Sequence, residues 1–192
     1  MTNEDNTSLI KDKDIKIKFK PLHYIIVGIV LILSLVSAFL NKQDILFMVQ
    51  VGLLSVLLTY ISLVDIETHL CPNWPNFIIF ALAIPNLILY ILAKDYYNLI
   101  NMLIGGLFGF LPLFLAALFT KKGIGGADIK IMTSLGFLIG PYKIISVLFT
   151  SLLLAIIVSV IRGIKNKNIK EISFAFLPYI SIATLIIWPL NI

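Results

Sequence analysis

Residues 45–64 read ILFMVQVGLLSVLLTYISLV, a run of 20 residues without one charged side chain. About 20 apolar residues in helical form span the roughly 30 Å hydrocarbon core of a bilayer. Lipid offers no hydrogen bonds to the backbone, so a run that crosses it has to satisfy its own amide and carbonyl groups as a helix. The stretch therefore predicts a transmembrane helix, and Asp65 follows it at once.

The composition of the whole chain supports a membrane protein. Hydrophobic residues make up 59% of the 192 residues and charged residues only 13%, which is more apolar surface than a soluble domain of this length can bury. The first apolar run, near Tyr24, lacks a signal-peptide cleavage pattern and is typical of an anchor. We expect residues 1–20 to form a polar cytoplasmic tail and residues 21–192 a single membrane-embedded domain.

Charge and cysteine content exclude two other classes. The net charge is +5, but the basic residues are scattered between apolar runs instead of being clustered on one face. This distribution indicates membrane topology and argues against nucleic-acid binding. Cys71 is the single cysteine, so the sequence contains neither a disulfide framework nor a Cys-x-x-Cys zinc motif.

Seven apolar stretches define the predicted bundle, six of them long enough to cross a bilayer. Runs long enough to cross a bilayer lie at 24–40, 45–64, 77–93, 99–120, 144–161 and 172–192. A shorter stretch, 129–140, crosses if its helix extends from Ala127 to Tyr142, and is otherwise re-entrant. The two cases differ in where the basic residues fall.

The positive-inside rule decides for crossing. With seven spans and a cytoplasmic N-terminus, the basic residues divide 12 inside to 3 outside; without the extra span the division is 9 to 6. The three outside lysines are Lys42, Lys94 and Lys143. The sequence therefore predicts an all-α polytopic membrane protein with about seven transmembrane helices, its N-terminus inside and its C-terminus outside.

Two aspartates stand out against this topology. The residue before a proline avoids helical geometry, so Pro72 should stop the second helix near Cys71 and leave Asp65 about 9 Å inside its end. Asp128 begins the fifth predicted span on the same cytoplasmic side. Ionisable residues at membrane depth are costly to place there and indicate function.

A pair of nearby carboxylates suits one kind of chemistry. Two such groups share a proton, so one can take a proton from water while the other donates to a carbonyl oxygen. Gly123, Gly125 and Gly126 would allow close backbone approach and positive φ beside Asp128, as an extended substrate strand requires. Because a helix N-terminus favours a negative charge, we expect Asp128 to be the more often ionised member.

Three stretches carry a family resemblance. DIETHLCPN, residues 65–73, resembles the first-aspartate motif of type IV prepilin peptidases, in which Pro-Asn follows seven residues after the aspartate. GIGGADIK, residues 123–130, is similar to their second, glycine-rich motif, and FLPYIS, residues 176–181, resembles their final helix less closely. The resemblance covers roughly residues 45–190.

The resemblance implies an intramembrane aspartyl endopeptidase of the GxGD type, with Asp65 and Asp128 as its catalytic pair and no cofactor or metal. It would cut the basic leader from pilin-like or pseudopilin-like precursors at the cytoplasmic membrane. Residues with a substrate-positioning or structural role would be Gly123, Gly125, Gly126, Lys130, Pro72 and Asn73. Neither the precursor nor the oligomeric state follows from the sequence.

The chain departs from the family pattern in two ways. Ala127 stands where the second motif has a glycine, and its methyl group should matter only if φ there is positive. The cysteine-rich methyltransferase insertion of larger bacterial members has no room between the first two spans. The resemblance therefore implies a peptidase without N-methylation activity, similar to compact archaeal preflagellin peptidases or those of tight-adherence pilus systems.

Plainer interpretations stay open for single residues. Asp65 could pair with an interfacial lysine, Asp128 could cap its helix, and Asp65 with His69 has the spacing of a metal site. Glu67 points about 160° away from Asp65 on a helical wheel, which indicates a surface charge. Asn73 and Asn76 are of a type that often satisfies loop backbone.

A competing functional class uses the same aspartates. They could relay protons or bind a cation in a transporter component, and a scaffold for a membrane assembly is a third reading. Against transport, both aspartates lie toward one face instead of the midplane, and the sequence has no internal repeat.

Overall fold

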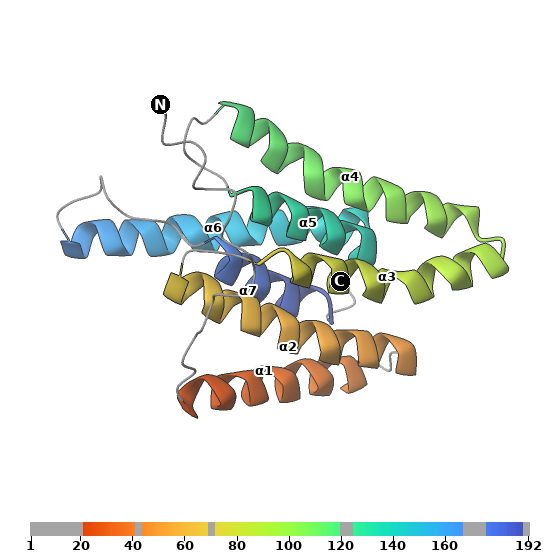
Figure 1. The fold of residues 1–192 in the computed structure, drawn as a ribbon, viewed down its shortest axis with the longest axis horizontal. Coiled ribbons are helices and arrows are strands. Elements are labelled where there is room, and N and C mark those ends of the chain that lie inside the picture. The colour runs from red at the N-terminus through yellow and green to blue at the C-terminus, as the bar shows by residue number, and fades with distance from the viewer. Residues whose placement is uncertain (1–20, 41–43, 69–71, 120–124, 167–175, 190–192) are drawn as a thin grey trace, which may run out of the picture.

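The computed structural model describes residues 21–40, 44–68, 72–119, 125–166 and 176–189, and these contain seven helices and no strand (Figure 1). The helices are α1 Pro21–Leu40, α2 Ile45–Thr68, α3 Trp74–Leu92, α4 Tyr96–Phe119, α5 Gly126–Ile139, α6 Pro141–Asn166 and α7 Leu177–Ile187. The predicted all-α class is confirmed. The predicted tail, residues 1–20, lies outside the described residues.

Four of these helices, α2, α3, α4 and α6, are long and apolar enough to cross a membrane. Shorter apolar helices lie within α1 and at α7, and α5 has 14 residues. Many large apolar side chains on the surface are exposed, Phe119 by 86% and Ile45 by 81%. A surface this apolar needs lipid around it, and the protein is a multi-pass membrane protein.

The fifth helix ends earlier than the sequence predicted. A helix running to Tyr142 was expected, but α5 ends at Ile139 because Gly140 takes a positive φ of 83°, which is costly for residues with a Cβ. Pro141 then begins α6, a position where its missing N–H and fixed φ do no harm. A single residue therefore joins α5 to α6, and Lys143 lies in a helix instead of a loop.

The helices fall into two neighbouring groups. In one, α5 packs against α3, α4 and α6; in the other, α2 packs against α1 and α7. Helix α7 also contacts α6 and so joins the groups. Figure 1 shows this order, from α4 at one edge through α5 to α2 and α1 at the other. The helices that carry Asp65 and Asp128 therefore belong to different groups.

The closest backbone approach joins α4 and α5. A Cβ added to Gly109 would lie 2.8 Å from the carbonyl carbon of Met132, and nearer still to its oxygen. Gly105 and Gly136 face each other's backbone in the same way, one turn further along. Small residues four apart let transmembrane helices touch at the backbone, and this contact fixes the register of α5 on α4.

Candidate active site

Asp65 lies in the last turn of α2, which ends at Thr68. Its side chain is 7% exposed, whereas Ile66 and Glu67 are exposed. The exposure of Glu67 agrees with the helical wheel, which placed Glu67 on the side of the helix away from Asp65. The helix was expected to continue to Cys71, but residues 69–71 lie outside the described residues, so Asp65 is about 4.5 Å from the described helix end.

A serine pair fixes the helix beside Asp65. Ser62, one turn earlier on the same face, donates from Oγ to Ser181 Oγ of α7 at 2.7 Å. Ser181 also lies within hydrogen-bond distance of two carbonyl oxygens, that of Leu177 at 2.9 Å and that of Leu58 at 3.2 Å. Ser62 and Ser181 are both buried. The stretch FLPYIS is therefore bound to the turn of α2 that precedes Asp65.

Asp128 is the third residue of α5, and Gly125 is the N-cap residue. The Asp128 backbone N–H donates to Gly125 O at 3.1 Å, and the backbone N–H of Gly125 donates in return to the Asp128 carboxylate. This return bond is the half of a capping box that an acidic residue at the third position makes. Asp128 thus stabilises its helix start without being the N-cap residue itself.

The glycines before Asp128 act through space and not through positive φ. A Cβ added to Gly125 would lie 3.2 Å from Asp128 Oδ2, whereas one added to Gly126 would meet nothing within 4 Å. In the described residues only Lys94 and Gly140 have positive φ. The expected positive φ at Gly125 and Gly126 is therefore wrong, and the methyl group of Ala127 causes no backbone strain. Gly123 lies outside the described residues.

The two aspartates interact electrostatically across the helix groups, because the charge of Asp65 acts on Asp128. Asp65 is buried and Asp128 is partly buried. Two like charges repel one another, so the pair is most stable when it holds one proton. The fold thus allows the charge of Asp65 to act on Asp128, although the sequence places the two residues 63 apart.

Two hydrogen bonds connect the start of α3 to α5. Lys130 Nζ donates to Asn73 Oδ1 at 3.1 Å, and Ser134 Oγ donates to Asn76 Oδ1 at 2.6 Å. Both asparagine oxygens thus accept from side chains of α5, a role that the loop-backbone interpretation did not include. The first bond joins the two sequence motifs directly. Pro72, beside Asn73, is buried.

The sequence did not single out Ser62 or Ser134, and it included Ser181 only as the last residue of FLPYIS, without a contact to α2. A signal was present for Ser62, which lies three residues before Asp65 and so on the same helical face. Among the described residues no group of three metal-ligating side chains occurs. His69, the proposed partner of Asp65 in the metal alternative, lies outside them.

The protein is therefore an integral membrane protein built as a multi-pass helical bundle. Its candidate site consists of two aspartates on separate helices that interact electrostatically. The sequence model of the type IV leader peptidase family matches residues 52–160, which is more than half of the chain. The chain belongs to this family, and it is accordingly a membrane peptidase. The matched range includes both aspartates and ends before FLPYIS. Comparison with curated proteins and with solved structures finds no match.

Proposed function

We propose that the protein is an aspartic endopeptidase of the cytoplasmic membrane, which removes the basic leader from type IV pilin-like precursors. Asp65 and Asp128 are its catalytic pair. The observation that carries the proposal is the electrostatic interaction of these two carboxylates across two helix groups. Family membership supports peptide hydrolysis, and it favours this activity over the transporter alternative.

The surroundings of the aspartates suggest a division of roles. Asp128 lies in the first turn of α5, where the helix dipole and the Gly125 N–H favour a carboxylate against the opposing effects of burial and of the Asp65 charge. Asp65 is the more buried of the two, and burial favours the neutral acid. Asp128 then takes a proton from the attacking water, while Asp65 donates its proton to the scissile carbonyl oxygen. Collapse of the tetrahedral intermediate returns Asp65 to the acid form as the proton on Asp128 passes to the leaving amine.

The substrate and the topology belong to the same proposal. With the N-terminus inside, both aspartates lie at the cytoplasmic face, where the basic leader of a precursor remains after its apolar segment enters the bilayer. Only residues 41–44 separate α1 from α2, which leaves no place there for a methyltransferase insertion. We therefore expect cleavage without N-methylation of the product.

The test is co-expression with a pilin-like precursor, followed by gel analysis of leader removal. Asp65→Asn and Asp128→Asn should each slow cleavage at least about a thousandfold, because the loss of one member of a catalytic pair removes most of the activity of the pair. Glu67→Gln is the matched control, since it removes a carboxylate from the exposed side of the same turn. Cleavage at the wild-type rate by either asparagine variant, with equal protein in the membrane, would refute the assignment.

A further inference from the structure

A second polar region lies at the other end of α5. A cavity of about 320 Å³ is bounded by the end of α3, the start of α4 and the α5–α6 junction. Its wall includes Asn86 and Tyr90 from α3 and Asn98 and Asn101 from α4. Ile139 is 11 residues beyond Asp128 on α5, a rise of about 16 Å along the helix. The cavity is therefore separate from the candidate active site.

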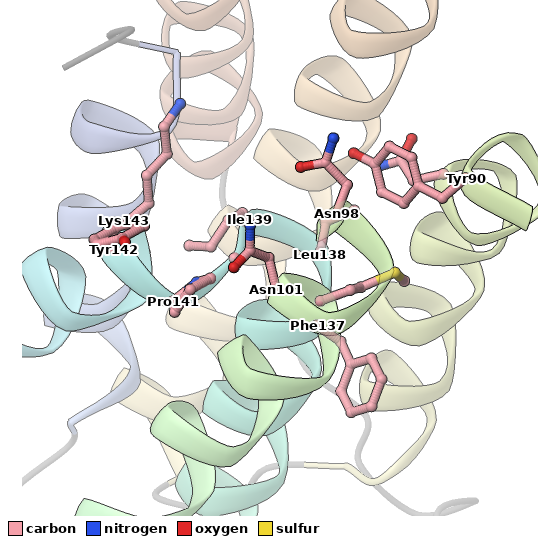
Figure 2. Close-up of a pocket in the computed structure, with 12 residues that line it drawn as sticks. Tyr90, Asn98, Asn101, Phe137, Leu138, Ile139, Pro141, Tyr142 and Lys143 are labelled. Carbon is pink, nitrogen blue, oxygen red and sulfur yellow. The ribbon is translucent and has the colours of Figure 1, made fainter. Parts of the chain in front are cut away.

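The cavity is polar on one side and apolar on the other. Figure 2 shows the carboxamides of Asn98 and Asn101 and the amine of Lys143 pointing to one side, with the ring of Phe137 on the opposite side. Met102 also belongs to the lining and is buried. A ligand that matches both sides has to be an amphiphile, with a polar group joined directly to an apolar chain.

Several donors in this wall are available for an anion. Lys143 Nζ donates one hydrogen bond, to the carbonyl oxygen of Trp188 at 3.4 Å, and an ammonium group has three donors. The Asn101 side chain forms no hydrogen bond to another described residue, whereas the Asn98 side-chain amide already donates to Asp95 Oδ2 at 2.6 Å. An ammonium and a carboxamide in the wall of one cavity are both donors that can bind a phosphodiester through charge-assisted hydrogen bonds.

The surface around the cavity faces lipid. Ile100 and Leu103, which flank Asn101 and Met102 on α4, are 52% and 54% exposed, and Tyr142 is 76% exposed beside Lys143. A volume of about 320 Å³ is at the low end of the ~300–1,000 Å³ range of ligand sites. It has room for a headgroup whose acyl chains continue along the membrane-facing surface.

We infer that this cavity binds one phospholipid, with its phosphodiester against Lys143 and Asn101 and its acyl chains on the Met102 and Phe137 side. Headgroup sites in basic pockets between transmembrane helices follow the same chemistry. The bound lipid would contact α3, α4 and the α5–α6 junction at once. The inference does not depend on the peptidase assignment.

The test is native mass spectrometry of the full chain in detergent, titrated with dioleoylphosphatidylglycerol or with dioleoylglycerol, which lacks the phosphate. Wild-type protein should bind one phospholipid at least about tenfold more tightly than dioleoylglycerol. Lys143→Gln and Asn101→Leu should each weaken phospholipid binding about tenfold, the loss of one charge-assisted hydrogen bond. Lys94→Gln is the matched control, because Lys94 is an exposed lysine in the α3–α4 turn outside the cavity lining.

Three results would overturn the inference. Equal binding of dioleoylglycerol and phosphatidylglycerol by the wild type would remove the role of the phosphate. Unchanged binding by both cavity variants would place the lipid elsewhere. Displacement of the lipid by millimolar glycerol phosphate would assign the cavity to a soluble phosphate ester. If Lys143→Gln unfolds the protein in a thermal melt, the comparison of the two lipids and Asn101→Leu still decide.

Discussion

Replacing Gly109 with alanine should displace Asp128 and slow catalysis strongly. The added Cβ would lie 2.8 Å from the carbonyl carbon of Met132 and 3.2 Å from the Cα of Thr133. These are backbone atoms and cannot rotate away, so α4 and α5 have to separate by a distance on the order of 1 Å. Met132 is four residues, one helical turn, beyond Asp128, and the shift reaches the carboxylate.

The expected effect has two parts. Forcing extra volume into a close-packed contact costs about 1–3 kcal/mol of unfolding free energy, which lowers the midpoint of thermal unfolding in detergent. Misplacing a catalytic group by about 1 Å costs on the order of a hundredfold in rate, so kcat/KM for leader cleavage should fall by about that factor. The rate loss should exceed what the stability loss alone would cause.

The control is Gly28→Ala in α1, where an added Cβ meets no atom within 4 Å. It should cleave like the wild type and gain up to about 1 kcal/mol, because alanine favours a helix over glycine. If Gly109→Ala melts and cleaves as the wild type does, the α4–α5 contact does not position Asp128, and the reasoning is refuted.

Two further substitutions test the surroundings of Asp128. Ser134→Ala removes the hydrogen bond to Asn76 and should cost about 1 kcal/mol in thermal or denaturant unfolding; Asn76→Ala combined with it should add little, since both remove one bond, and additive losses would contradict the pairing. Gly125→Ala places a Cβ 3.2 Å from Asp128 Oδ2 and should lower kcat/KM about tenfold, as for a small misplacement of a catalytic group, with a smaller loss of stability because alanine is a poorer N-cap residue than glycine. Gly126→Ala should cleave at the wild-type rate, because its added Cβ meets no atom within 4 Å. Equal cleavage rates for the two variants would show that a Cβ at Gly125 does not displace the Asp128 carboxylate.

The helices were predictable because lipid imposes a strong local rule. A backbone in hydrocarbon has to satisfy its own hydrogen bonds, so the charge-free run at 45–64 could hardly be other than the helix seen as Ile45–Thr68. The sequence also separated 129–140 from its neighbours, and α5 lies there, although its 14 residues are too few for it to be one of the four helices long enough to cross. Its end at Ile139 was missed, because Gly140 is one glycine among eleven and its φ follows from packing.

The aspartate pair was predictable for a related reason. Charges are rare in these helices, so Asp65 and Asp128 were conspicuous by their type alone. The hydrogen bonds that hold their helices were not, because Ser62 meets Ser181 across 119 residues and Ser134 meets Asn76 across 58. Serine in an apolar helix most often bonds its own preceding turn, and a single sequence does not show which serine bonds elsewhere.

The one-residue connection at Gly140 limits how the bundle can open. Neighbouring Cα atoms lie about 3.8 Å apart, so the adjoining ends of α5 and α6 cannot move away from each other as rigid bodies. If these two helices separate, the gap between them has to be narrowest at Gly140 and widest at the N-terminal end of α5. That end carries Asp128, so a separation of α5 from α6 would be widest beside this carboxylate.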